Sequence, residues 1–439
     1  MKYKVEAFDK MHFFIRTAIE PMIHCRIDFA GHIDIDVLKK AVTLSMDTVP
    51  LIQCCFDDSR LLPRWIDKHF TAEDIVHVEN ADRDKDTEKQ IADRLAKEID
   101  MKTEPQLKIH IIRKTEGDTF CVIINHMISD GGGFKQYLYL LGELYTKLKK
   151  NQPIPVIAPQ QRGLKPLLSG MKLAEKLRIM RSPAYYLDAF ASIEQLGTDF
   201  NAINGSAYIA RQTISKEQFD KLRSFGKSLD ATVNDTFMAL FLRSFCKLTK
   251  TDKAKCLSTM DMRRFIPPNI NIGRGIDNYS SHGACLVYIK ADDPFNVTVK
   301  QVKEQMDYYK TGNNILRGMI WWHYIARFIP FHTLKRQYAK FINIPALIFS
   351  NFSIIDSALS RFDDLPIESY AISAGINHSP CFQLIISTYR GCCTLCSSFF
   401  GDDDSKLWVD RLYNNIISEI ESLTNHPLAE GLHSKHSDF

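Results

Sequence analysis

The chain has 439 residues, enough for two to three domains of about 150 residues each. Hydrophobic residues make up 45% and charged residues 25%, a composition that excludes a disordered chain or a fibre. The 56 Lys and Arg nearly balance the 52 Asp and Glu. A net charge of +4 gives no case for a nucleic-acid-binding protein, which usually carries a concentrated basic face.

The cysteine pattern and the termini indicate the cellular compartment. The eleven cysteines are odd in number and scattered through apolar runs, which predicts buried thiols rather than a disulfide framework. Residues 1–6 lack the apolar core of a signal peptide. The most apolar candidate for a membrane span, residues 315–331, is interrupted by Arg317, His323 and Arg327. We therefore expect a soluble, cytoplasmic protein with no stable membrane span.

Strands and helices alternate in the first third of the chain. Apolar and polar residues alternate over 23–29, as on a half-buried strand, and Asp34 or Asp36 can cap a helix that stops before Pro50. The other predicted strands are 51–56, 107–113 and 119–124, and the other predicted helices are 84–101 and 134–148.

A proline-rich stretch over 151–159 predicts a linker, because prolines continue neither helix nor strand. The second part then repeats the alternating style. Residues 167–196 are predicted to be mostly helical, with a break near Pro183. The further helices are predicted at 216–229, 232–245, 295–309, 315–328 and 407–423, and the strands at 207–214, 285–289, 381–388 and 393–399. The last two strands form a predicted hairpin around Arg390 and Gly391.

Residues 121–134 are the stretch that indicates chemistry. An apolar strand runs into a polar turn that contains His126 and Asp130, and three glycines and a helix follow. Histidine at such a position can accept and return a proton near neutral pH, although a lone histidine is more often structural. A metal site would need further ligands, and no second cluster has convincing spacing. A phosphate loop would need a Lys-Ser or Lys-Thr ending, which is absent.

Cys393 and Cys396 form an isolated Cys-x-x-Cys pair in a predicted strand. Side chains three positions apart on a strand point to opposite faces, so we expect no metal or redox role.

The segment from His126 to Gly131 resembles the His-x-x-x-Asp-Gly motif of the chloramphenicol acetyltransferase-like superfamily. This group includes condensation domains of nonribosomal peptide synthesis, alcohol acetyltransferases and polyketide-associated acyltransferases. Further segments resemble the same superfamily, so that the resemblance covers roughly residues 5–425: they are 231–236, 258–264 with Asp261 and Arg263, Asn278-Tyr279, and 350–353.

The resemblance implies an α/β fold of two acetyltransferase-like subdomains. Each would be a mixed sheet flanked by helices, with the active-site tunnel between them. The implied first half is 1–170 and carries the motif. The second half is 171–439 and includes a crossover segment near 345–380.

The resemblance also implies a role for each of the site residues. His126 would be the general base that takes a proton from the acceptor as it attacks a thioester, with no acyl-enzyme. Gly131, with Gly132, would bring backbone N–H groups close to the acyl carbonyl. Asp130 would point away from the substrate and pair with an arginine, Arg263 first and Arg264 second.

Three further residues are candidates for contacts with the oxyanion or the acceptor: Asn351, Ser353 and Asn125. For Asn351, an ordinary turn residue at a strand end is an equal alternative. Ser353 stands where the superfamily's Ser-Asn-x-Gly segment has glycine, which puts the local geometry of the tunnel in doubt. No metal ligand is expected.

The resemblance therefore implies an acyltransferase. Condensation domains usually carry two successive histidines, but the first position here is Asn125, which favours a free-standing acyltransferase. The leading expectation is transfer from an acyl-CoA, most simply acetyl-CoA, to a small alcohol or amine. The co-substrate would be a coenzyme A thioester, with no bound cofactor, and the chain would be a monomer. The alternatives are a phosphopantetheinyl carrier protein as donor, or a catalytically silent carrier-binding protein.

Overall fold

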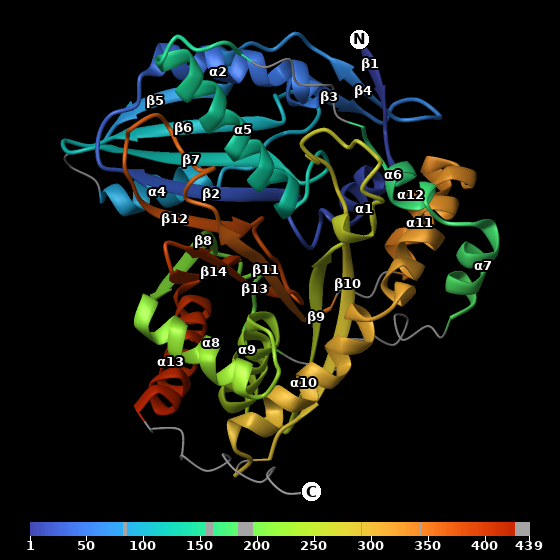
Figure 1. Cartoon of the computed structure of the whole chain (residues 1–439), viewed down its shortest axis with the longest axis vertical. Helices are drawn as coiled ribbons and strands as arrows, with labels where there is room; N and C mark the ends of the chain where they lie inside the picture. Colours follow the sequence, from blue (N-terminus) through green and yellow to red (C-terminus); the bar gives the residue numbers. More distant parts are fainter. Residues whose placement is uncertain (82–85, 155–160, 183–195, 291, 342–344, 426–439) are drawn as a thin grey trace, which may run out of the picture.

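The computed structural model describes residues 1–81, 86–154, 161–182, 196–290, 292–341 and 345–425. Its strands form two large mixed sheets, one above the other in Figure 1, and a small antiparallel sheet at the upper edge. Helices flank both large sheets, so the chain has the two-lobed α/β architecture that the motif led us to expect.

The upper lobe is built on a five-stranded sheet. Its strands are, in spatial order, β12 (Ile367–Ala374), β2 (Met22–Phe29), β7 (Asp118–Asn125), β6 (Leu107–Arg113) and β5 (Val76–Asn80). Helices α2 (Ile35–Thr48) and α5 (Gly131–Lys149) pack together over the sheet, and the short α3 (Ala72–Ile75) contacts α2. Helix α4 (Thr87–Leu95) packs against β7 and β2 and also contacts β8 (Ser206–Ile214) of the lower lobe. The small sheet consists of β1 (Lys2–Lys4), β4 (Arg64–Asp67) and β3 (Cys54–Asp57).

The lower lobe is built on a six-stranded sheet. Its strands are, in spatial order, β10 (Ser280–Tyr288), β9 (Lys253–Asp261), β11 (Leu347–Ile355), β13 (Phe382–Tyr389), β14 (Cys392–Gly401) and β8 (Ser206–Ile214). Its helices are α8 (Lys216–Ser228), α9 (Val233–Thr249), α10 (Phe295–Lys310) and α13 (Asp403–Asn425). The aromatic residues of α9 anchor this lobe, because Phe237, Phe241 and Phe245 are fully buried.

A third group of helices lies beside both lobes, on the right of Figure 1. It contains α1 (Ala7–Ile15), α6 (Lys165–Ser169), α7 (Leu173–Arg181), α11 (Leu316–Phe328) and α12 (Phe331–Phe341). Helix α11 touches both α1 and α7, and the Trp322 indole donates a hydrogen bond to the carbonyl of Ala7 at 2.7 Å. Of the helices described, none combines the length and apolarity that crossing a bilayer requires.

The two large sheets meet at β12, which comes late in the chain but belongs to the upper sheet. It pairs antiparallel with β2 and packs against β13 and β14 of the lower sheet. Small side chains make this approach close, since Ala371 and Ala374 of β12 contact Ile385 and Cys396. The division of the chain into halves at residue 170 stays a prediction.

Many elements agree with the sequence pattern. Helix α2 begins after Asp34, whose carboxylate accepts the N–H of Val37 at 3.2 Å, so Asp34 and not Asp36 is the cap. The hairpin of β13 and β14 turns at Arg390 and Gly391, which both have positive φ. The eleven cysteines, all within the described residues, are free thiols as expected. Cys393 and Cys396 face different apolar clusters on the two sides of β14.

Several predicted elements have the wrong extent, among them the strand predicted at 285–289, which is β10 and begins at Ser280. The strand predicted at 51–56 is a 3₁₀ turn over Pro50–Gln53 followed by β3, and Pro50 occupies the first position of the turn, where its fixed φ is favourable. Within the described part of the range 84–101, the predicted helix is α4, which ends at Leu95, and Asp100 accepts the N–H of Lys102 in a separate turn. The helical region 167–196 is divided into α6 and α7. Its break near Pro183 and part of the linker at 151–159 lie outside the described residues.

Candidate active site

His126 lies immediately after the C-terminal end of β7, the middle strand of the upper sheet. It is the one residue between Cys121 and Asp130 that is not fully buried. Its backbone N–H donates to the carbonyl of Pro21 at 2.7 Å, which fixes the chain against the start of β2. A buried strand thus presents a half-buried imidazole on an anchored turn.

Asn125 holds this turn from the buried side. Its amide oxygen accepts the N–H of Met127 at 2.9 Å, and its amide nitrogen donates to the side-chain oxygen of Gln106 at 2.7 Å. Asn125 is fully buried. These contacts favour a supporting role for Asn125 instead of the acceptor or oxyanion contact that the sequence led us to expect.

Asp130 ends the turn and caps α5. One carboxylate oxygen accepts the N–H of Gly133 at 2.8 Å, and the other accepts the backbone N–H of Tyr279 at 2.7 Å. Arg263 completes the arrangement with two hydrogen bonds to the carboxylate, at 2.7 and 3.2 Å. The same guanidinium donates to the carbonyls of Gly275 and Asp277. Asp130 and Arg263 therefore join α5 to the loop before β10.

The electrostatics of this pair favour the charged form of both groups. Burial alone would raise the pKa of Asp130, but the charge of Arg263 and the hydrogen bonds hold it below its usual value. Burial likewise opposes the charge on Arg263, and Asp130 overcomes it, so the pKa of Arg263 is raised. Arg264, the second candidate, instead donates to the carbonyl of Tyr309 at 3.2 Å.

The first two glycines of α5 give room to groups from the lower lobe. A Cβ on Gly131 would lie 2.3 Å from the ring of Phe352, and one on Gly132 would lie 2.7 Å from the Arg263 guanidinium. Only glycine permits both approaches without a shift. The glycines thus let β11 and the Arg263 side chain reach the motif.

Asn351 and Ser353 flank Phe352, at an irregularity in the pairing of β11 with β13. The N–H of Ser353 donates to the side-chain oxygen of Asn351 at 2.7 Å. Ser353 has a φ of 60°, the left-handed conformation that glycine adopts most easily, so the backbone geometry suits a glycine although the residue is serine. Asn351 and Ser353 are neighbours in the chain of Phe352, whose ring lies against Gly131 of the motif. The hydrogen bond between Asn351 and Ser353 joins only these two residues and does not reach the motif.

Burial controls the charge of His126. Desolvation is the largest influence and lowers its pKa, while the charge of Asp130 acts in the opposite direction. The Asn278 amide nitrogen donates to the carbonyls of His126 and Met127, at 2.9 and 3.1 Å. The imidazole is therefore neutral, as a base requires, at pH values where a free histidine begins to take up protons.

Two histidines that no motif identifies lie next to His126. The ring of His12, from α1, stacks on that of His126 with centroids 4.0 Å apart and planes at 25°. His282, from β10, is close enough to lower the pKa of His12. Desolvation and His126 lower the pKa of His282 to about 4. His12 lies 114 positions before His126, and His282 lies 156 positions after it, so the spacing in the sequence could not reveal the cluster.

A second buried ion network supports the turn. Arg162 makes two hydrogen bonds to Asp9, at 2.9 and 3.1 Å, and lies 3.3 Å from Asp277. It also donates to the carbonyl of Met127 at 3.4 Å. Desolvation raises the pKa of Asp277 to about 6, against the opposing charge of Arg162. The sequence offered no signal for this network beyond the family-like turn at Asn278.

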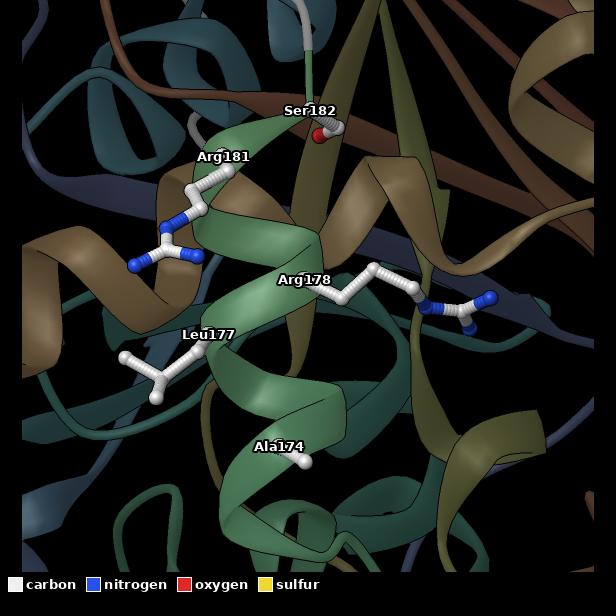
Figure 2. A pocket seen from close by; sticks show the side chains of 5 residues that line it. All are labelled: Ala174, Leu177, Arg178, Arg181 and Ser182. Carbon is white, nitrogen blue, oxygen red and sulfur yellow. The ribbon is translucent and has the colours of Figure 1, made fainter.

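Two other kinds of candidate site, a metal site and a surface pocket, receive little support. Among the residues described, no three His, Cys, Asp or Glu side chains are grouped as metal ligands. Figure 2 shows a depression on α7 lined by Ala174, Leu177, Arg178, Arg181 and Ser182. None of these residues belongs to the motif, and α7 lies at the outer edge of the molecule, beyond α11 (Figure 1).

Comparisons with known proteins agree with this geometry. A family model described as the condensation domain matches residues 22–312, more than half of the chain. Bacitracin synthase 3 of Bacillus licheniformis is 21% identical over 225 residues, which are 49% of this chain but 4% of that protein. The chain thus spans a small fraction of the length of this relative.

Solved structures share the fold over nearly the whole chain. The first condensation domain of the CDA synthetase has a TM-score of 0.69 at 11% identity, with 97% of each chain covered. The trichothecene 15-O-acetyltransferase TRI3 of Fusarium sporotrichioides also has a TM-score of 0.69, at 9% identity, with 96% of this chain and 95% of that chain covered. With the family match over residues 22–312, which include the motif turn, the chain belongs to the condensation-domain family.

Proposed function

We propose that this chain transfers an acyl group from a thioester on a carrier protein to an amine or hydroxyl acceptor, with His126 as the general base. The observation that carries the proposal is the half-buried imidazole of His126 on a turn fixed by Asn125, Asn278 and Asp130. Burial lowers the pKa of this imidazole and so favours its neutral form. Such a base is worth about 10²- to 10⁴-fold in rate when an acceptor lies within hydrogen-bond reach.

The chemistry balances with one proton transfer and no covalent enzyme intermediate. The acceptor oxygen or nitrogen attacks the thioester carbonyl while His126 takes its proton. The new C–O or C–N bond forms, the C–S bond breaks, and the proton returns to the departing thiolate. A backbone N–H of Gly131 would stabilise the developing oxyanion. Asp130 and Arg263 act by holding the turn and do not touch the reacting atoms.

The choice of donor rests on the relatives. The condensation-domain match and the similarity to a synthase of bacitracin support a carrier-bound thioester. Acetyl-CoA, the donor expected first from the sequence, is the second candidate, and the fold shared with a 15-O-acetyltransferase favours it. We keep a small alcohol or amine as the acceptor, the cytoplasm as the location, and the monomer as the oligomeric state.

The test offers both donors to the same protein. An acylated phosphopantetheinyl carrier and a set of acyl-CoAs would each be mixed with a pool of amines and alcohols, and product would be followed by mass spectrometry. His126→Ala should lower transfer by about 10²- to 10⁴-fold. His332→Ala, an exposed histidine on α12, is the matched control and should transfer at the native rate.

Each outcome selects one function. Transfer from the carrier alone establishes the proposal, and transfer from free acyl-CoA establishes the second candidate. A protein that binds the acylated carrier with equal affinity in the native and His126→Ala forms, and transfers from neither donor, is a carrier-binding protein without catalysis.

A further inference from the structure

We propose that His12 is a positioning residue for His126, whose ring plane it fixes and whose imidazolium it stabilises by stacking. The inference deepens the proposed function, because it concerns the same base. It adds a residue from α1, more than a hundred positions before the motif, to the site.

The geometry is that of a face-to-face stack. The two ring centroids are 4.0 Å apart and the planes are inclined by 25°. Both residues are half-buried. A flat neighbour at this distance limits rotation of the His126 ring about its χ2 angle, a torsion that is otherwise broad. Stacked rings do not exchange a proton directly, so His12 acts through the face of its ring.

Helix α1 is held against the motif turn independently of the stack. Asp9, one turn before His12, accepts two hydrogen bonds from Arg162 and one from the indole of Trp65 at 2.8 Å. The same Arg162 donates to the carbonyl of Met127, the residue after His126. The ion network therefore sets the distance between α1 and the turn, which places His12 over His126.

The charges around the pair favour His126 as the ring that becomes protonated. Burial, His126 and His282 together lower the pKa of His12 well below its usual value. Asp130 faces His126 and favours its positive charge. The remaining buried charges next to the turn are Arg263, which pairs with Asp130, and the network in which Arg162 faces the two carboxyl groups of Asp9 and Asp277. When His126 takes the acceptor's proton, the neutral face of His12 lies against a cation, an interaction of the cation–π kind.

The experiment compares two replacements that fill the same space. His12→Phe keeps a π face over His126, whereas His12→Leu keeps the bulk and the exclusion of water without it. The pKa of His126 would be measured by NMR titration of histidine labelled with ¹³C and ¹⁵N, with the signal assigned through His126→Gln. His77→Ala is the control, because His77 belongs to another stacked pair, with His110 at 5.0 Å.

We expect the Phe variant to keep the native pKa of His126 and most of kcat. The Leu variant should lower that pKa and reduce kcat by about 3- to 30-fold, with KM for the donor unchanged. The His77 variant should change neither. Equal pKa values for His126 in the Leu and Phe variants would overturn the inference. His12→Met replaces the Leu variant if that protein does not fold.

The titration needs no substrate, so the two proposals fail separately. A pKa of His126 that responds to His12 in a protein without transfer supports the stack and overturns the proposed function. Transfer that depends on His126 but is identical in the Leu, Phe and native proteins supports the proposed function and overturns the stack.

Discussion

Arg263 is shared by two carboxylates whose environments differ. The side chain of Asp130 is 1% exposed, whereas that of Asp261 is 56% exposed, and both lie within 3.0 Å of the guanidinium. Removing one member of a buried pair leaves an uncompensated charge away from water, but a solvated pair contributes little. The two aspartates are therefore a matched test of how burial sets the strength of an ion pair.

We expect Asp130→Asn to lower the free energy of unfolding by about 3–5 kcal/mol, since Arg263 would stay buried without its counter-charge. Asp261→Asn should cost under about 1 kcal/mol. Urea unfolding of both variants, followed by circular dichroism, measures the difference. Equal losses would show that the guanidinium does not distinguish the two partners.

Glu20 is a buried acid outside the candidate site. One of its carboxylate oxygens accepts the N–H of Ile376 at 2.9 Å, and the other has no hydrogen-bond partner among the residues that the structure describes. Desolvation, only partly offset by that hydrogen bond, raises the pKa of Glu20 to about 8. The unfolded chain releases this proton near pH 4.5, so between these values the folded state holds one proton more. Stability from this group is therefore full below pH 4.5 and is lost as the pH rises through 8.

Glu20→Gln imitates the protonated acid and should remove this dependence. We expect the urea midpoint of the native protein to fall relative to that of the variant between pH 5 and 9, where each pKa unit of difference corresponds to about 1.4 kcal/mol. Glu116→Gln, at an exposed turn, is the control and should track the native protein. Parallel curves for the native and Glu20→Gln proteins would contradict the prediction.

At the scale of single elements, the first turn of α5 has an unusual composition. It begins with three glycines, which are poor helix formers, directly after the Asp130 cap. The close approach of Phe352 to Gly131 explains the first of them, since a side chain there would meet the ring. At Gly131, the close contact between the lobes thus decides the residue type, at the expense of helix propensity.

Gly131→Ala tests this balance. Alanine would add up to about 1 kcal/mol of helix propensity, but its Cβ would lie 2.3 Å from the Phe352 ring, and overpacking costs about 1–3 kcal/mol. We expect lower thermal stability and reduced transfer. Adding Phe352→Leu should restore both. Gly312→Ala, where the nearest atom is 3.5 Å away, should leave both unchanged.

The elements that could be predicted have strong local signals. Helix α2 combines a cap at Asp34 with an apolar stripe, and the last hairpin has glycine at its turn. The elements that the sequence pattern does not predict are α1, α3, α12, β1, β4, β5, β9, β11 and β12. Strand β11 lies between two parallel neighbours, β9 and β13, so no hairpin turn marks its ends.

The candidate site shows the same division between local and distant signals. His126, Asp130 and the glycines lie in one short segment, and Arg263 follows from a second family-like segment. His12, Arg162 and Asp277 meet the motif only through tertiary structure, from positions that no motif joins. One sequence therefore predicts the candidate base, His126, and the ion pair that holds its turn, but not the ring of His12 that stacks on it.

At the scale of the whole molecule, one strand crosses from the lower lobe to the upper one. Residues 367–374 complete the sheet of the upper lobe, although the residues on either side of them in the chain build the lower one. Strand β2 has partners on both edges only when β12 is present. The upper lobe thus depends on residues that come more than two hundred positions after its last helix, α5.

A fragment of residues 1–170 should therefore not fold as an independent unit. Without β12, the edge of β2 is open, and unpaired edges of apolar strands associate with one another. We expect aggregation or a broad, non-cooperative thermal transition, measured by light scattering and circular dichroism. A monomeric fragment with a sharp transition would show that β12 is dispensable.

The position of β12 also sets an order of events during biosynthesis. Residues 30–366 separate β2 from its partner, and ribosomes add roughly 5–20 residues per second. About 20–70 s therefore pass between the synthesis of β2 and that of β12. During that interval the nascent upper lobe presents an unpaired strand whose natural partner does not yet exist, which leaves this edge open to pairing with other exposed strands.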